Sequence, residues 1–230
     1  MITTEKIKLV RSLREKKFRD SLGLFVVEGE KMVQEALDSD FEVVEVFRIG
    51  EEGEQKMARI SLQSSPSPAL AIVRQKKAPA LSQGLCLALD SVRDPGNMGT
   101  IIRLADWFGI KTVFASPDSV EVYNPKVVQS TMGAIFRVGV VYCDIPELCR
   151  RFSSQGREVY GTFLGGENIY AAPLQMDGLV VMGNESRGIS PEVAAQVSRR
   201  ITIPSFGGSA MESLNVAIAT AITISEFKRR

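Results

Sequence analysis

The sequence predicts an α/β protein of two domains, and three observations lead to this fold class. Short apolar runs alternate with helical stretches along the whole chain, which is typical of α/β proteins. Beyond residue 84 the apolar runs are continuous, as expected for a parallel sheet that is covered on both faces. The uncharged segment 78–84, which contains Pro and Gly, predicts a linker between a domain at 1–77 and another at 85–230.

The first domain is predicted to be a small α/β unit of about 75 residues. Thr3 or Thr4 is a suitable N-cap for a first helix that runs to about Arg14. Strands are expected at 24–28, 43–49 and 69–75, and further helices at 31–37 and 51–62. The segment 63–68 is rich in Ser and Pro and is therefore expected to be a loop.

The second domain is predicted to alternate longer strands with helices. Strands are expected at 85–91, 112–115, 138–142, 159–164, 179–182 and 201–203. Helices are expected near 98–108, 125–135, 145–152, 191–197 and 212–227. The last helix is apolar around much of its circumference, and such a helix is normally buried on more than one side. One side can pack on the sheet of its own chain, and the other requires a partner.

The residue composition excludes several kinds of chemistry. Histidine is absent, which removes a histidine-based catalytic triad and any zinc site that contains histidine. The three cysteines, Cys86, Cys143 and Cys149, lie in apolar stretches and are odd in number, so buried thiols are expected rather than a disulfide framework. The chain has no apolar run long enough to span a membrane and no signal-peptide pattern at its N-terminus, so a cytoplasmic protein is expected.

The first 20 residues carry an excess of positive charge, although the net charge of the whole chain is only +1. Seven Lys and Arg side chains stand against three acidic ones in this segment. The candidates for phosphate binding among them are Lys8, Arg11, Arg14, Lys16, Lys17 and Arg19. Two interpretations stay open on this segment alone, namely phosphate binding and the solvated face of a first helix.

Three loops rich in glycine and small polar residues follow apolar strands late in the chain, at 161–166, 183–185 and 203–208. Ligands of open α/β sheets bind beyond the carboxyl ends of the strands. The three loops together therefore predict a ligand site, although any one of them alone is explained as a turn. The segment 183–190 has the glycine spacing of a phosphate-binding loop, but Ile189 stands where a lysine is required, which excludes a nucleoside triphosphate.

Two helix starts carry polar residues. Asn97 is predicted to cap the helix near 98–108, and Arg103 lies six residues further on, in the second turn. Ser213 and Asn215 stand at the start of the apolar last helix, where they are again suitable caps. Capping and surface exposure are sufficient explanations for each of these residues taken singly.

Taken together, these segments resemble the three motifs of the SpoU (TrmH-like) ribose methyltransferases of the SPOUT superfamily. The motifs are Asn97-x-Gly-x-x-x-Arg103, Met182-Gly-x-Glu185-x-x-Gly188, and Ile203-Pro204 followed by Ser213-Leu-Asn-Val216. Their order, spacing and strand–loop–helix context match across residues 85–230. Residues 16–29 are similar to the family's N-terminal substrate-binding domain, which resembles ribosomal protein L30e.

The resemblance implies an RNA-binding enzyme that moves a methyl group from S-adenosylmethionine to a ribose 2′-hydroxyl of RNA without a metal ion. It also implies a homodimer and a deep trefoil knot in the C-terminal α/β domain, against the general rule that chains are unknotted. The residues expected around the reacting ribose are Asn97, Arg103, Glu185, Ser213 and Asn215. Those expected at the cofactor are Thr162, Phe163, Leu164, Gly165, Gly183, Asn184, Ile203, Pro204 and Leu214. The basic residues near the N-terminus become candidates for RNA binding.

The two-domain organisation favours ribosomal RNA over transfer RNA as the substrate. A tRNA methyltransferase and a non-catalytic RNA-binding protein of the same fold are the alternatives, and the basic first domain disfavours an enzyme of small molecules. Since no histidine is present to act as a base, we expect Arg103 to hold the phosphate next to the ribose and to stabilise the developing alkoxide. Glu185 is expected to orient Arg103.

Overall fold

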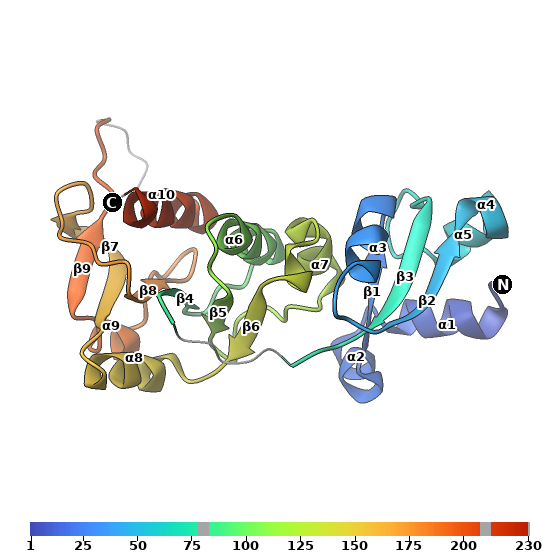
Figure 1. Cartoon of the computed structure of the whole chain (residues 1–230), viewed down its shortest axis with the longest axis horizontal. Helices are drawn as coiled ribbons and strands as arrows, with labels where there is room; N and C mark the ends of the chain where they lie inside the picture. Colours follow the sequence, from blue (N-terminus) through green and yellow to red (C-terminus); the bar gives the residue numbers. More distant parts are fainter. Residues whose placement is uncertain (78–82, 208–212, 230) are drawn as a thin grey trace. The chain divides into compact units, whose positions relative to one another are not determined.

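The computed structural model describes residues 1–77, 83–207 and 213–229. Contacts between residues divide the chain into two units. Unit 1 consists of Met1–Lys77 and Glu121–Arg137, and unit 2 consists of Ala78–Val120 and Val138–Arg230. Figure 1 shows the elements in chain order, coloured from blue to red. Each unit has a sheet of its own and is described by itself.

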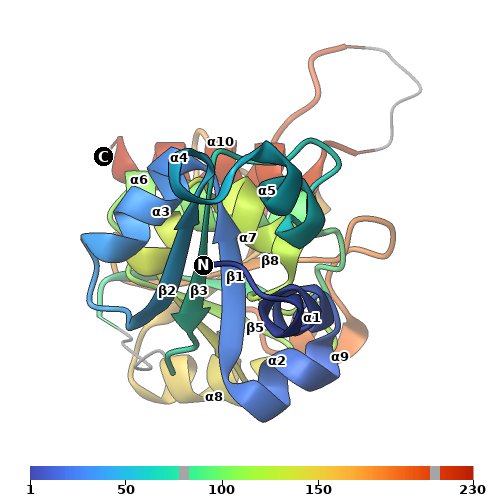
Figure 2. The same cartoon turned by 90° about the vertical axis from the view of Figure 1, so that its right-hand side faces the viewer.

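Unit 1 contains a three-stranded antiparallel sheet in the order β1-β3-β2, whose strands are labelled in Figure 2. Its strands are β1 Leu24–Glu28, β2 Val43–Arg48 and β3 Ala69–Arg74, each within one residue of the expected strand. The helices of 1–77 are α1 Thr4–Ser12, α2 Lys16–Leu22, α3 Glu30–Leu37, α4 Ile49–Glu52 and α5 Glu54–Ile60. The central strand β3 is buried except for its last residue, so it forms the core of this unit.

Glycines with positive φ set two boundaries in unit 1 that the sequence pattern did not predict. Helix α2 was not expected, and it ends where Gly23 adopts a left-handed φ of 64°. The single helix expected at 51–62 is divided into α4 and α5 by Gly53, whose φ of 82° lies outside the helical region. Residues with a Cβ rarely adopt these angles, so glycine is required at both positions.

The segment 121–137 is inserted between two strands of unit 2 but packs within unit 1. It contains α7 Pro125–Thr131 and the 3₁₀ helix η1 Ala134–Phe136, because Met132 and Gly133 adopt positive φ and interrupt the helix expected at 125–135. The rings of Phe25 and Tyr123 lie 4.5 Å apart. The domain expected at 85–230 is therefore not continuous, because its segment 121–137 packs in the first unit.

Unit 2 contains a six-stranded sheet in the order β6-β5-β4-β8-β7-β9. All of its pairings are parallel, which confirms the prediction of a parallel sheet. The strands are β4 Leu85–Leu89, β5 Thr112–Ala115, β6 Gly139–Tyr142, β7 Glu158–Asn168, β8 Gly178–Met182 and β9 Arg199–Thr202. Strands β4, β5 and β8 are buried along their whole length, as their continuous apolar sequences predict.

The helices of unit 2 are α6 Pro95–Trp107, α8 Ile145–Ser154, α9 Pro191–Ala194 and α10 Val216–Lys228. Helices α6 and α10 pack against each other, as Figure 1 also shows. Part of the segment expected to form the trefoil knot, 208–212, lies outside the described residues, and the knot stays a prediction. The three cysteines are free thiols, with Cys86 and Cys149 buried and Cys143 half-buried. In the part of the chain that the structure describes, no helix is long and apolar enough to cross a membrane.

Candidate functional site

The start of α6 brings Asn97 into the candidate site. Asp94, not Asn97 as expected, caps this helix, and its Oδ1 accepts a hydrogen bond from the Asn97 backbone N–H at 2.8 Å. Pro95 occupies the first helical position, where its missing N–H costs nothing, so the helix begins earlier than the pattern indicated. The side chain of Asn97 is therefore released from capping. Its Nδ2 donates to Glu185 Oε1 at 3.1 Å.

Asn215 joins the same cluster from α10. As expected, it caps this helix, and its Oδ1 accepts hydrogen bonds from the N–H groups of Ala217 and Ile218 at 2.9 and 3.3 Å. Capping uses the oxygen and leaves the amide nitrogen, which donates to Asn97 Oδ1 at 2.9 Å. Glu185, Asn97 and Asn215 thus form one chain of hydrogen bonds, which we call the polar relay. Its members come from all three sequence motifs.

Glu185 is an acceptor of several hydrogen bonds. The N–H groups of Arg93 and Asp94 donate to its carboxylate at 3.4 and 3.1 Å, and Asn184 Nδ2 donates at 3.2 Å. Partial burial raises the pKa of the Glu185 carboxyl, but the hydrogen bonds from Asn97, Asp94 and Arg93 outweigh it and hold this pKa below its ordinary value. Glu185 is therefore ionised at neutral pH, and it can accept hydrogen bonds but cannot donate a proton.

A tight turn presents Glu185. Gly183 lies so close to the far side of this turn that a Cβ on it would stand 2.2 Å from the backbone carbon of Gly188. Asn184 Oδ1 accepts hydrogen bonds from the N–H groups of Ser186 and Arg187 at 3.0 and 3.1 Å, which closes the turn. The side chain at position 185 is thus held on a rigid backbone next to the end of β8.

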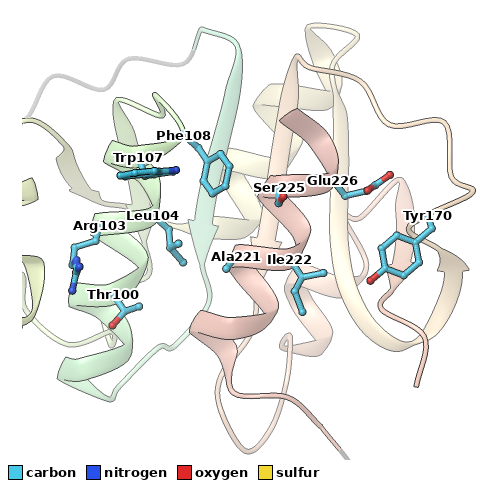
Figure 3. A pocket seen from close by; sticks show the side chains of 10 residues that line it. All are labelled: Thr100, Arg103, Leu104, Trp107, Phe108, Tyr170, Ala221, Ile222, Ser225 and Glu226. Carbon is cyan, nitrogen blue, oxygen red and sulfur yellow. The ribbon is translucent and has the colours of Figure 1, made fainter. Parts of the chain in front are cut away.

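Arg103 lies on a different face of α6 from Asn97. Six residues along an α-helix correspond to a rotation of about 120°, so the two side chains diverge. Arg103 is exposed and lines a pocket of about 820 Å³ together with Trp107 of the same helix and with Ala221 and Ile222 of α10. Figure 3 shows these side chains around the pocket. Within the described residues the side chain of Arg103 makes no hydrogen bond or ion pair, so the expected contact with Glu185 is not present.

The segments expected to bind the cofactor lie within or directly after neighbouring strands of the sheet. The segment 183–185 and the described part of 203–208 follow β8 and β9, whereas 161–166, which was expected to be a loop, lies within β7; these strands are neighbours in the order β8-β7-β9. Strand β7 continues beyond its expected end at residue 164, with an irregularity in its pairing between Thr162 and Glu167. This irregularity contains three further predicted cofactor residues, Phe163, Leu164 and Gly165.

The surroundings of these loops fit an adenosine-containing ligand. The side chains of Leu164 and Leu214 are 77% and 47% exposed, so apolar surface is available to cover a base. A Cβ on Gly165 would meet no atom within 4 Å, which leaves open space beside the backbone. The hydroxyl of Thr162 donates to Val181 O at 3.2 Å and is therefore used within the sheet. Ser213 is exposed and makes no hydrogen bond within the described residues, so it is not part of the polar relay.

The basic residues near the N-terminus divide into accessible and buried ones. Lys8 is exposed and makes no ion pair within the described residues. Arg11 Nε donates to Arg59 O at 2.9 Å, and a terminal nitrogen of Arg14 donates to Leu62 O at 2.8 Å, so each guanidinium keeps further N–H groups for a ligand. Lys16 and Lys17 are exposed and form ion pairs with Asp20 and Glu15.

Arg19 does not fit its expected role in RNA binding. It is only 2% exposed, and its guanidinium donates to the carbonyls of Leu13 and Arg14 and to Glu121 Oε2 at 2.5 Å. Breaking a buried ion pair of this kind costs several kcal/mol, because the remaining buried charge would have no partner. Arg19 therefore joins α2 to the inserted segment 121–137 instead of facing a ligand.

Sequence reasoning missed four residues near the relay, Asp94, Ser91, Ser116 and Asp118. The pair Asp94-Pro95 is the common signature of an N-cap followed by the first helical residue, and it could have placed the start of α6. The other three are brought together only by the pairing of β4 with β5, and no local pattern marks them. Among residues 1–77, 83–207 and 213–229, no group of three or more potential metal ligands is present.

Two protein-family models match the chain. The model of the SpoU rRNA Methylase family matches residues 84–225 and so covers more than half of the sequence. The model of the MRM3-like substrate binding domain matches residues 4–76. The two matches correspond to the two domains that the sequence predicts at 85–230 and 1–77.

Individual proteins match over nearly the whole length. The 23S rRNA (guanosine(2553)-2'-O)-methyltransferase RlmP of Bacillus subtilis (strain 168) is 29% identical over 236 residues, which cover 96% of this chain and 94% of the relative. A TrmH-family structure from Porphyromonas gingivalis has a TM-score of 0.89 and 40% identity, with 100% and 99% of the two chains covered. An AdoMet-bound rRNA methyltransferase from Sinorhizobium meliloti has a TM-score of 0.88 and 28% identity, with 100% and 96% covered.

Proposed function

Because the chain belongs to the SpoU rRNA methylase family, we propose that it methylates a ribose of 23S ribosomal RNA. The chain is an RNA ribose 2′-O-methyltransferase that uses S-adenosylmethionine. The narrower assignment to 23S rRNA is supported by the relative RlmP, which acts on that RNA and 94% of whose length this chain matches. The structural observation that carries the proposal is the polar relay of Glu185, Asn97 and Asn215, in which Glu185 lies in the glycine-containing turn after β8.

The proposed cofactor residues lie in β7, in the turn after β8, in the segment after β9 and just before α10. Their backbone N–H and C=O groups suit the adenine edge, and exposed apolar side chains such as Leu164 and Leu214 suit its faces. When bound, S-adenosylmethionine supplies a methyl group that is already an activated electrophile. The full proposed set is Thr162, Phe163, Leu164, Gly165, Gly183, Asn184, Ile203, Pro204 and Leu214, with Thr162 contributing through its backbone.

The protein's own residues have two proposed tasks, alignment of the ribose and stabilisation of charge. Alignment of an oxygen with an electrophile can account for several kcal/mol of the barrier. The polar relay offers an ionised carboxylate and two amides for hydrogen bonds to the ribose hydroxyls, with Ser213 as a further donor. Arg103 is proposed to hold the adjacent phosphate and to stabilise the alkoxide that develops as the 2′-hydroxyl proton passes to that phosphate or to water and the oxygen takes the methyl group. A guanidinium stays protonated, so it acts here as a donor and not as a base.

The position of Arg103 favours a homodimer. It lies on the outer face of α6, away from the polar relay of its own chain. Trp107 beside it is 84% exposed, and Ile218 on α10 is 52% exposed, so the two helices present a joint apolar surface. We call this surface, made of Leu104, Trp107, Ile218, Ala221 and Ile222, the α6–α10 face. A second copy of the chain would cover it and would bring Arg103 to the cofactor loops of that copy.

A ribose-methylation map of RNA from cells with and without this gene tests the substrate. We expect one 2′-O-methyl mark in 23S rRNA to disappear and to be restored by the purified protein with S-adenosylmethionine. If a mark disappears only from tRNA, the substrate is tRNA and the proposal of 23S rRNA is wrong. An unchanged map together with no methyl transfer to any RNA in vitro would favour the non-catalytic RNA-binding alternative.

Residues 1–77 are proposed to capture RNA, with Lys8, Arg11 and Arg14 as the principal phosphate-binding residues. Alanine at all three positions is expected to weaken RNA binding. It should also reduce the slope of log K against log salt by about 0.7 for each phosphate of a single strand that is no longer neutralised. A titration at several salt concentrations measures both effects. The affinity for S-adenosylmethionine should not change.

The matched control is Lys31→Ala, which removes an exposed positive charge from α3 of the same unit. It should leave the salt slope near that of the wild type. A change of slope in Lys31→Ala about one third as large as that in the triple variant would mean that only the total charge of the unit matters, since one charge is removed instead of three. A fall in cofactor affinity in the triple variant would contradict the division of tasks between the domains at 1–77 and 85–230.

A further inference from the structure

The loop 91–94, which joins β4 to α6, supports the polar relay. The N–H groups of Arg93 and Asp94 donate to Glu185, and Ser91 O accepts a hydrogen bond from Asn184 Nδ2 at 2.7 Å. Asp94 also caps the helix that carries Asn97. A shift of this loop would therefore move Glu185 and Asn97 together.

Ser91 has a backbone conformation that needs support. Its φ of 59° lies in the left-handed region, which residues with a Cβ rarely adopt. Its N–H donates at 2.8 Å to Oγ of Ser116, which follows the neighbouring strand β5. The loop is thus held in a strained conformation by side chains that come from the next strand of the sheet.

Asp118 connects these contacts. Its carboxylate accepts hydrogen bonds from Ser91 Oγ at 2.6 Å, from Ser116 Oγ at 2.7 Å and from a terminal nitrogen of Arg93 at 3.0 Å. It therefore binds two residues of the loop and the serine that supports the Ser91 backbone. The hydroxyl of Ser116 uses its single proton on Asp118, so Ser119 is the donor in the 2.9 Å contact between the two serines.

The charge of Asp118 is constant under working conditions. Hydrogen bonds from Ser91 and Ser116 lower the pKa of its carboxyl to about 2, in spite of partial burial. The carboxylate is therefore an acceptor at every pH at which an RNA substrate is handled. Acceptance by an ionised oxygen strengthens each of these hydrogen bonds.

We propose that Asp118 is a positioning residue of the methyl-transfer reaction, which acts through Ser91 and Arg93 to hold Glu185 and Asn97 in place. The inference rests on the proposed role of the polar relay at the reacting ribose. Asp118 reaches Glu185 only through the loop 91–94, so it aligns the relay and does not contact the substrate. Half of its side chain is accessible to solvent, which makes it a poor candidate for a core residue.

The substitution Asp118→Asn keeps the shape of the side chain and removes its charge and one acceptor. We expect the single-turnover rate to fall about 10- to 100-fold, as is usual when reacting groups lose their alignment. The affinities for RNA and for S-adenosylmethionine should remain nearly those of the wild type. Hydrogen–deuterium exchange of the amides of residues 91–97 should become faster.

A second substitution removes the same hydrogen bond from its other end. Ser91→Ala should lower the rate in the same way, and the double variant should fall much less than the product of the two single effects, because both changes break one hydrogen bond. If Asp118→Asn folds poorly, the rate and the exchange of residues 91–97 in Ser91→Ala alone still test the inference.

The matched control is Asp144→Asn. The Asp144 carboxylate accepts a hydrogen bond from the N–H of Glu147 and caps α8. Because Asn is about as good an N-cap as Asp, this variant should keep both the melting temperature and the rate of the wild type. The inference is overturned if Asp118→Asn transfers methyl groups at the normal rate, or if its rate falls only in proportion to cofactor affinity and melting temperature. A wild-type protein that methylates no RNA would refute the proposed function, and unchanged exchange at 91–97 in Asp118→Asn would still refute this inference by itself.

Discussion

Replacement of Arg103 by alanine is expected to lower the single-turnover rate of methyl transfer by about 10²- to 10³-fold, the usual loss when one donor to a developing oxyanion is removed. The chain has no histidine, so no imidazole is available to share the stabilisation of charge. The side chain of Arg103 makes no hydrogen bond or ion pair in the described part of its own chain, so its guanidinium is available to bind a phosphate. Rapid-quench measurements with saturating RNA and S-adenosylmethionine separate this step from binding.

The substitution Arg103→Lys tests whether methyl transfer requires the planar shape of the guanidinium or only its positive charge. Lysine keeps the positive charge but lacks the planar fork that binds a phosphate through two parallel hydrogen bonds. We expect it to recover little of the rate, and we expect its pH–rate profile to keep the form of the wild-type profile. Near-normal activity of this variant would contradict a bidentate contact. A new ionisation in its profile would indicate that the side chain at position 103 takes up the proton.

Disruption of the α6–α10 face is expected to convert a homodimer into inactive monomers. Ile218→Asp would place an unpaired charge in a covered apolar interface, which costs several kcal/mol and raises the dissociation constant of the dimer by about 10²- to 10³-fold. Light scattering and sedimentation at micromolar concentration measure the oligomeric state. The methyl-transfer rate should follow the fraction of dimer.

Leu37→Asp is the matched control for this substitution. Leu37 is 44% exposed, close to the 52% of Ile218, and it lies on α3 in unit 1. The same change of charge there should leave the dimer intact. A wild-type protein that is a stable, active monomer would refute the homodimer.

Mixed dimers test whether one site uses both chains. One chain carries Arg103→Ala, and the other carries Gly183→Ala, whose added Cβ would stand 2.2 Å from the backbone of Gly188 and open the turn. Random exchange of equal amounts makes half of the dimers mixed, and each mixed dimer has one intact site of two, so about a quarter of the wild-type activity should return. No recovery in spite of confirmed exchange would mean that each site is complete within one chain.

The sequence by itself determined the strands and those features that depend on neighbouring residues. The continuous apolar strands predicted the parallel sheet of unit 2, and the position of Asn215 at the start of an apolar helix predicted the cap of α10. The resemblance of the motifs around Asn97 and Glu185 to those of the SpoU family implied that both residues lie at one site, and these two residues do form a hydrogen bond. The sheet and the cap follow from hydrophobic periodicity and from the preference of Asn for helix starts, which need no knowledge of distant contacts.

Only the tertiary structure decided which side of an element each functional residue faces. Arg103 and Asn97 share one motif, yet the rotation between them along α6 places them in different surroundings. Arg19 looks like its basic neighbours in the sequence, and it is buried because Glu121, a residue 102 positions away, packs against it. The support of Ser91 by Asp118 likewise depends on the pairing of β4 with β5. Burial and partners arise from packing between segments far apart in the chain, and a local pattern carries no information about them.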